Sequence, residues 1–193
     1  MEKKLLITGF DPFGGGNINP SWEAVKLLPE QVGQYHIHKL AIPTIFGTAA
    51  EMILTQAQQL HPNVIISVGL AGGRDAVTPE RIAVNIRDAR IADNRGVQPR
   101  GDRVVPEGPA AYFSTMPVEK MAEAIRQAGI PAAVSNTAGT FVCNDVLNTL
   151  LHHFDKASVR VGFIHVPYLP SQGTPNMELA DIAKALTAAI EAL

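Results

Sequence analysis

The 193-residue sequence has little of several features that mark specialised classes of protein. It has one cysteine, Cys143, so no intrachain disulfide can form and a disulfide-stapled scaffold is excluded. Its formal net charge is −2 and its lysines and arginines are scattered, which argues against a nucleic-acid or anionic-membrane partner because phosphate binding needs clustered cations. No apolar stretch reaches the roughly 18–20 residues that span a bilayer, and the apolar run near the N-terminus is too short for a signal peptide. These absences predict a soluble protein of the cytoplasm.

Well-known catalytic and nucleotide-binding motifs are absent as well. The glycines at 14–16 and 69–73 follow neither the Walker pattern nor the Gly-x-Gly-x-x-Gly pattern, so we expect tight turns there rather than a nucleotide site. No Gly-x-Ser-x-Gly elbow and no His-Glu-x-x-His helix occurs, which excludes the corresponding serine hydrolases and zinc peptidases. His36 and His38 could share one face of a strand, but two ligands without a third make a poor metal site. The sequence therefore predicts neither a cofactor nor a metal ion.

What the chain does contain is typical of a globular α/β protein. Apolar residues make up 46% and charged residues 18%, and the length is that of one domain covering residues 1–193. Short apolar or alternating stretches predict strands at 5–8, 35–42, 64–68, 81–86, 132–135 and 159–166. Segments with helical spacing alternate with them at 22–28, 46–60, 118–128, 143–154 and 179–193, the last preceded by an expected cap and first-turn proline at Thr174-Pro175. This alternation predicts an α/β fold with a central, largely parallel sheet, and the polar segment 92–110 predicts a long loop or weak hairpin.

Three of the predicted strands end in segments rich in glycine or in reactive side chains. These segments are 68–73, 135–139 and 164–167. Ligands of such sheets bind beyond the carboxyl ends of the strands, so we expect the three segments to converge on one site.

Cys143 follows one of these segments and is expected to open a helix. The free backbone N–H groups of a helix start favour a thiolate and lower the pKa of the thiol, and they also provide donors for an oxyanion. The alternative is that Cys143 is a small buried side chain, because free cysteine is among the most buried residue types. Its position alone leaves the two interpretations about even.

A nucleophilic thiol needs a base, and the base needs an acid that orients it. His165 lies at the end of the predicted strand 159–166 and could reach the carboxyl edge of the sheet, although a hydrogen-bonded core histidine is the more common role for such a residue. Glu80 is one candidate for the acid, but residue chemistry does not select it over Asp75 or Asp145. The residues therefore indicate a Cys–His–acid hydrolase as one hypothesis and leave its substrate open.

Five longer stretches resemble the pyroglutamyl peptidase I family of cysteine peptidases. Segment 69–85 (GLAGGRDAVTPERIAVN) is similar to the glutamate signature of that family, and segment 134–144 (VSNTAGTFVCN) is similar to its cysteine signature. Segments 7–15 (ITGFDPFGG) and 19–22 (NPSW) resemble its N-terminal loop, and segment 163–167 (FIHVP) resembles its histidine strand. The resemblance covers essentially the whole chain and implies a three-layer α/β/α sandwich with a twisted, mixed sheet.

The resemblance also implies a metal-free peptidase without a cofactor that removes an N-terminal pyroglutamyl (5-oxoproline) residue from peptides. It implies Cys143 as nucleophile, His165 as general base and acid, and Glu80 as the group that orients His165. The substrate contacts that it implies are Phe10, Phe13, Asn19, Leu70, Arg90, Phe141 and Val142, with Thr44 and Ile91 as weaker contributors. Leu70 departs from the family pattern, which carries glutamine at this place. Homotetramers are common in the family, so the implied partners are pyroglutamyl peptides and further copies of this chain.

Two other functions stay open. One is a different hydrolase or acyltransferase that uses the same cysteine, histidine and glutamate on another small cyclic amide. The other is a non-catalytic binding domain in which Cys143 is simply buried.

Overall fold

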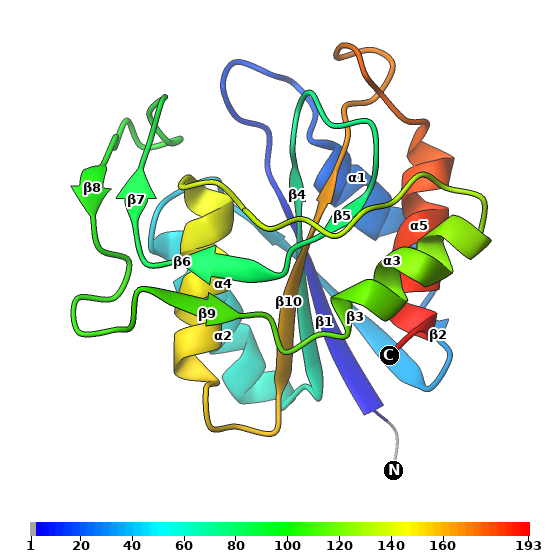
Figure 1. Ribbon diagram of the computed structural model, residues 1–193, viewed down its shortest axis with the longest axis horizontal. Helices are drawn as coiled ribbons and strands as arrows, with labels where there is room; N and C mark the ends of the chain where they lie inside the picture. The colour runs from blue at the N-terminus through cyan, green and yellow to red at the C-terminus, as the bar shows by residue number, and fades with distance from the viewer. Residues whose placement is uncertain (1–2) are drawn as a thin grey trace.

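The computed structural model describes residues 3–193, and a six-stranded mixed sheet runs through its centre (Figure 1). The strands lie in the order β2-β3-β1-β4-β10-β5, with the four central strands parallel and the two short edge strands antiparallel to their neighbours. Their bounds are β1 (Lys3–Phe10), β2 (Gln31–Val32), β3 (Tyr35–Ile42), β4 (Val64–Leu70), β5 (Thr78–Pro79) and β10 (Arg160–Val166). The prediction of a central, largely parallel sheet is confirmed.

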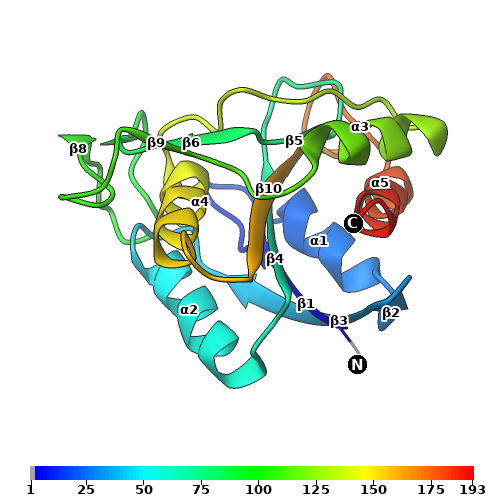
Figure 2. The same cartoon turned by 60° about the horizontal axis from the view of Figure 1, so that its bottom comes forward.

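Helices cover both faces of this sheet and complete a three-layer α/β/α sandwich (Figure 2). One face carries α1 (Pro20–Leu27), α3 (Val118–Gln127) and α5 (Leu179–Glu191), and the other carries α2 (Thr48–Leu60) and α4 (Val142–His153). The helices predicted from the spacing of apolar residues all occur, with ends that differ by a few residues.

The strands β1, β4 and β10 are mostly apolar and buried because both of their faces are covered. In β1, Leu5 and Ile7 belong to the core under α1, α3 and α5. Leu6 and Phe10 belong to the second core, under α2 and α4. Side chains of a strand alternate between its faces, so one continuous apolar run supplies both cores. β4 is buried throughout except at its last residue, Leu70, which marks the edge where the sheet opens to solvent.

Two short two-stranded sheets lie beside the main one. β6 (Ile82–Val84) pairs with β9 (Ala111–Phe113) next to α4, and β7 (Arg87–Asp88) pairs with β8 (Arg100–Asp102). The expected loop or weak hairpin at 92–110 thus contains one short strand, β8.

The segment 132–135, which the sequence predicts as a strand, is not one in the structure. It forms single backbone bridges, Val77 with Ala132 and Glu80 with Ser135. The two bridges lie three residues apart and do not form a continuous ladder, so the segment is not a strand. These bridges nevertheless hold the chain leading to α4 against the chain that carries Glu80.

The start of α5 also differs from the sequence prediction. The expectation that Thr174-Pro175 supplies the cap and first-turn proline is wrong, because α5 begins at Leu179 with Glu178 at the N-cap. The N–H of Met177 donates to the carbonyl of Tyr168 (2.8 Å), so the chain before α5 pairs with the segment after β10. Extended backbone of this kind cannot adopt helical dihedral angles, and the helix starts only beyond it.

Candidate active site

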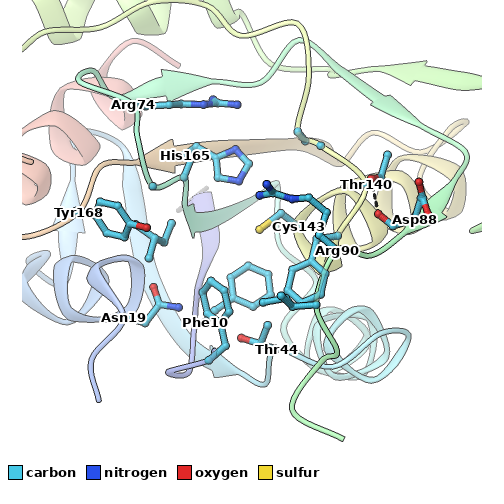
Figure 3. A pocket seen from close by; sticks show the side chains of 18 residues that line it. Phe10, Asn19, Thr44, Arg74, Asp88, Arg90, Thr140, Cys143, His165 and Tyr168 are labelled. Carbon is cyan, nitrogen blue, oxygen red and sulfur yellow. Dashed lines mark hydrogen bonds between the residues drawn. The ribbon is translucent and has the colours of Figure 1, made fainter. Parts of the chain in front are cut away.

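A cavity of about 780 Å³ opens at the carboxyl edge of the sheet (Figure 3). Phe10 at the end of β1, Leu70 at the end of β4 and His165 near the end of β10 all line it. The loop that leads into α4 closes another side. The three segments that the sequence singles out therefore converge on one site, as expected for a ligand site in a parallel sheet.

Cys143 lies in the first turn of α4, one residue after the helix begins at Val142. Its thiol lines the cavity and packs closely against β4, because a Cβ atom added at Gly69 would lie 2.9 Å from the sulfur. Glycine at position 69 therefore allows the sulfur to approach the strand end. The expected placement of Cys143 at a helix start is confirmed.

His165 and Glu80 form a buried hydrogen-bonded pair in the same region. Nδ1 of His165 lies 2.7 Å from Oε1 of Glu80, and the exposed fractions of the two residues are 3% and 0%. A carboxylate accepts hydrogen bonds but does not donate them, so Nδ1 carries the proton and Nε2 of the neutral ring keeps its lone pair. The imidazole and the sulfur of Cys143 lie on the same side of the cavity (Figure 3).

The edge strand β5 brings Glu80 to this position. β5 pairs antiparallel with β10, which places Thr78 opposite His165, and the N–H of Glu80 donates to the carbonyl of Phe163 (2.9 Å). Residues two apart along extended chain point to the same face, so the side chains of Thr78 and Glu80 both lie on the His165 side. The pairing of an edge strand thereby supplies the acid.

Burial is the largest influence on the pKa of His165 and lowers it, while the hydrogen bond and negative charge of Glu80 raise it without restoring the ordinary value. Burial raises the pKa of Glu80, but the hydrogen bond and charge of His165, together with the hydrogen bond from Arg74, bring it below its ordinary value. At neutral pH the pair therefore consists of an ionised carboxylate and a neutral imidazole. This is the state in which the imidazole accepts a proton.

The thiol of Cys143 is not activated in the way that the sequence predicts. Burial raises its pKa to about 12, and the negative charge of Glu80 contributes to the increase. The charge of Arg74 and a backbone hydrogen bond at the helix start lower the pKa but are outweighed. The expectation that the helix start gives a low thiol pKa is therefore wrong, because desolvation of the charged form has the larger effect. Cys143 needs a base, and neutral His165 is placed to serve as one.

Aromatic side chains form one wall of the cavity. The rings of Phe13 and Phe141 are 6.1 Å apart, and Phe46 contacts Phe141 edge-on at 5.3 Å. Such tilted and edge-on contacts are the favoured arrangements of aromatic rings and hold them in place. The predicted residues that line this part of the cavity are Phe10, Phe13, Phe141, Thr44 and Ile91.

Val142, also predicted as an apolar contact, is placed differently. Its side chain is fully buried in the core under α2 and α4 and does not line the cavity. Successive side chains of a helix point about 100° apart, so the helix turn that directs Cys143 into the cavity directs Val142 into the core.

Asn19 lines the cavity as predicted, but its side chain is engaged in the fold. Nδ2 donates to the carbonyl of Asp11 at 2.8 Å, and Oδ1 accepts from the N–H and the hydroxyl of Ser21 at 3.1 and 2.8 Å. Asn19 caps α1 in this way and anchors the loop that carries Phe13. One contribution of Asn19 to the site is therefore to hold that loop.

Leu70 and Arg90 line the cavity as well. Leu70 is partly exposed and presents an apolar side chain where the family pattern carries an amide. Arg90 is exposed, and its side chain extends over the cavity near Cys143 in the view of Figure 3. The cavity thus combines an apolar wall with cationic groups at its rim.

Arg74 and Tyr168 are among the lining residues that the sequence prediction misses. Nη1 of Arg74 donates to Oε1 of Glu80 at 2.7 Å. The ring of Tyr168 lies over Gly72, where an added Cβ atom would come within 2.2 Å of it, so a side chain at position 72 would displace this ring. Arg74 belongs to segment 69–85, which the sequence singles out, and Tyr168 directly follows segment 163–167. Spacing alone does not tell which way either side chain points.

The other candidate groups lie elsewhere. Asp75 is exposed, and the carboxylate of Asp145 accepts from the N–H of Gly47 (2.8 Å) and from Arg87 (2.6 Å). His152 is exposed and hydrogen-bonds the hydroxyl of Tyr112 (2.6 Å). Within residues 3–193, no group of three or more His, Cys, Asp or Glu side chains is arranged to hold a metal ion.

Comparison with known proteins connects this geometry to a family. The family model described as pyroglutamyl peptidase matches residues 3–193. The pyrrolidone-carboxylate peptidase of Levilactobacillus brevis is 51% identical, in a match that covers 98% of this chain and 97% of that protein. The pyrrolidone-carboxylate peptidase of Lactobacillus johnsonii is 49% identical, with coverage of 98% and 92%.

Solved structures agree with this result. The crystal structure of pyroglutamyl peptidase I from Bacillus amyloliquefaciens matches with a TM-score of 0.95 at 46% identity, over 100% of this chain and 95% of that chain. Pyrrolidone carboxyl peptidase from Thermococcus litoralis matches with a TM-score of 0.94 at 37% identity, over 98% and 92% of the two chains. The resemblance inferred from the sequence segments is confirmed, and the chain belongs to the pyroglutamyl peptidase family.

Proposed function

We propose that this chain hydrolyses the amide bond that follows an N-terminal pyroglutamyl residue, with Cys143 as nucleophile, His165 as general base and acid, and Glu80 as the residue that orients His165. The observation that carries these roles is the buried Glu80–His165 pair on the same side of the cavity as the thiol. Membership of the family supports the activity. Family membership does not favour the alternative that the chain is a non-catalytic binding domain.

The reaction starts from a neutral imidazole and a protonated thiol. Nε2 of His165 takes the proton from Cys143 as the sulfur forms a bond to the scissile carbonyl carbon, and the carbonyl oxygen becomes an oxyanion. The backbone N–H of Cys143, at the start of α4, is a donor for this oxygen. When the tetrahedral adduct collapses, the C–N bond breaks and the leaving amine takes the proton from His165. Water then attacks the thioester with His165 again as base, which releases pyroglutamate and restores the thiol.

The lining of the cavity also supports this choice of substrate. A pyroglutamyl end has no free amine, so its pocket needs no carboxylate. The aromatic wall of Phe10, Phe13 and Phe141 suits the apolar edge of the lactam ring, while the backbone near Leu70, at the end of β4, supplies polar groups for the ring N–H and C=O. Backbone pairing of this kind does not depend on the side chain at position 70.

The test of this function is a comparison of matched anilides at pH 7 to 8. Proline has a ring of the same shape but carries a charged amine and no ring carbonyl, and glutamine is open and cationic. An unpaired buried polar group costs on the order of 1–3 kcal/mol and an unpaired charge costs more, so we expect kcat/KM for the pyroglutamyl anilide to exceed both others by at least about a hundredfold. Comparable rates on all three would show that the aromatic wall is not a lactam pocket.

Three broader properties belong to the same proposal. We infer a single peptidase domain over residues 1–193, a homotetrameric assembly and a cytoplasmic location, on the grounds of the family resemblance and the single cysteine. None of the helices in the described part of the chain is long and apolar enough to cross a membrane. Light scattering on the purified protein would test the assembly, and cell fractionation would test the location.

A further inference from the structure

Arg74 lies in the loop between β4 and β5, and its guanidinium makes three hydrogen bonds around the site. Nη1 donates to Oε1 of Glu80 at 2.7 Å and to the hydroxyl of Thr78 at 2.5 Å, and Nη2 donates to the carbonyl of Thr137 at 2.9 Å. The carboxylate of this ion pair is fully buried, whereas 28% of the Arg74 side chain is exposed toward the cavity. Arg74 is thus the cation that directly contacts the acid of the proposed triad.

The three acceptors connect the segments that carry the reacting groups. Thr78 lies opposite His165 in the pairing of β5 with β10, and Glu80 follows two residues later. Thr137 belongs to the loop that leads to Cys143. Oε1 of Glu80 accepts from Arg74 and from Nδ1 of His165, so two donors on one oxygen determine the orientation of the carboxylate.

We propose that Arg74 is a positioning residue for the proposed reaction: it fixes the Glu80 carboxylate against His165 and holds the loop of Cys143 against the same strand. The inference rests on the proposed function, because it assigns Arg74 a role in that same site. Arg74 acts through Glu80 and His165 and does not take part in the proton transfers itself.

The charge of Arg74 has a further consequence for His165. The groups that face this imidazole are Glu80 from the end of β5, Arg74 from the β4–β5 loop and the thiol of Cys143 from α4. The positive charge of Arg74 lowers the pKa of His165 and that of Cys143. A base with a lowered pKa stays neutral to lower pH, so the wild-type kcat/KM should fall only below pH 6.5, the ordinary value for histidine. Loss of the Arg74 charge raises the pKa of His165, so kcat/KM then begins to fall at a higher pH.

Lysine cannot reproduce the arrangement, although it keeps the charge. The guanidinium is a planar fork whose donors point in fixed directions, and here two of its nitrogens serve three acceptors. A lysine ammonium is a compact charge on a flexible stem and cannot span Glu80 and Thr137 in the same way. The pair of variants Arg74→Gln and Arg74→Lys therefore separates the effect of geometry from that of charge.

Arg81 provides a matched control. It follows Glu80 in the chain and donates to the side chain of Asn136 (2.8 Å) in the same loop, and it pairs with Glu119. The hydrogen bonds of the Arg81 guanidinium go to Asn136 and Glu119, and not to the Glu80 carboxylate. An effect that arises merely from tethering the loop would appear equally in Arg81→Gln.

The experiment measures kcat, KM and the pH profile on a pyroglutamyl anilide for wild type and the three variants, together with the pKa of His165 by NMR. For Arg74→Gln we expect kcat to fall about 10- to 100-fold, in line with small displacements of reacting groups, with KM within about twofold. The decline of kcat/KM at low pH should begin at a higher pH than in wild type, and the pKa of His165 should be higher. In Arg74→Lys, kcat should fall as well, while the pH below which kcat/KM declines and the pKa of His165 should stay as in wild type. Arg81→Gln should resemble wild type in all of these quantities.

Several results would overturn the inference. A higher KM with unchanged kcat in Arg74→Gln would show that Arg74 binds substrate. An equal loss of kcat in Arg81→Gln would show that any contact that holds the loop at 136–137 has the same effect. If Arg74→Gln does not fold, Arg74→Lys decides, and wild-type kcat in that variant rejects a positioning role. If wild type does not cleave the anilide, the proposed function fails. The NMR titration of Arg74→Gln then still tests the network, since an unchanged pKa of His165 contradicts it and a raised pKa supports it.

Discussion

Replacement of Cys143 by serine is expected to reduce turnover by at least about a thousandfold while leaving the fold intact. The hydroxyl is a far weaker nucleophile than the thiol, and His165 is placed to remove one proton rather than to overcome that difference. The fold should persist because oxygen is smaller than sulfur. The serine side chain therefore leaves more space beside Gly69 than the cysteine does.

The measurement pairs a turnover assay with circular dichroism and a melting curve. Matching spectra and melting temperatures would show that the loss is chemical. Cys143→Ala serves as the control, because it removes the nucleophile without offering a hydroxyl. A serine variant within tenfold of the wild-type rate would rule out Cys143 as the nucleophile.

Replacement of His165 by alanine should be as damaging as loss of the thiol. With a thiol pKa of about 12, very little thiolate exists at neutral pH, so the reaction depends on a base that takes the proton during attack. Groups that act as one unit show losses of similar size when any of them is removed. We therefore expect Cys143→Ser, His165→Ala and the double variant to have nearly the same residual kcat/KM.

The helix α4 offers controls for this prediction. His152 and His153 are exposed at the far end of the helix, outside the cavity, so His152→Ala and His153→Ala should retain close to wild-type kcat/KM. Since His165 is buried against Glu80, His165→Gln is a second variant that keeps most of the side-chain volume if alanine destabilises the core. A large loss of kcat/KM in His152→Ala, or near wild-type kcat/KM in His165→Gln, would contradict the assignment of His165 as the general base.

The sheet and its helices could be predicted from the sequence because burial on both faces leaves a direct signature. β4 and β10 are buried and mostly apolar, and glycine or histidine appears near the end of each. The positions of Cys143 at a helix start and His165 at a strand end follow from those two kinds of element. Prediction from the pattern of apolar residues was wrong where backbone hydrogen bonds between neighbouring segments set the structure. Segment 132–135 has the composition of a strand but forms only two separate bridges. The chain just before α5 hydrogen-bonds through Met177 to Tyr168, and the helix starts after it.

The choice of Glu80 as the acid needed more than the pattern of residues. Glu80 and His165 are 85 positions apart in the chain and meet through an edge strand of two residues, β5, which carries no hydrophobic signal. Residue chemistry therefore left Asp75 and Asp145 as equal candidates, and it was the family resemblance that singled out Glu80.

The electrostatic state of the site depends on three-dimensional burial. The helix start favours a thiolate at Cys143, but the desolvation that outweighs it is set by the walls of the cavity. The link from Arg74 to Glu80 is likewise a matter of side-chain direction, which residue spacing does not encode.

The most direct test of the account is to trap the covalent intermediate. An activated pyroglutamyl ester should acylate the enzyme faster than the thioester is hydrolysed, so intact-protein mass spectrometry after rapid acid quench should show one added pyroglutamyl group. Digestion should place that group on the peptide that contains Cys143, and Cys143→Ser should remain unlabelled under the same conditions. An enzyme that turns over the ester without ever carrying the acyl group, or that carries it on another residue, would contradict nucleophilic catalysis by Cys143.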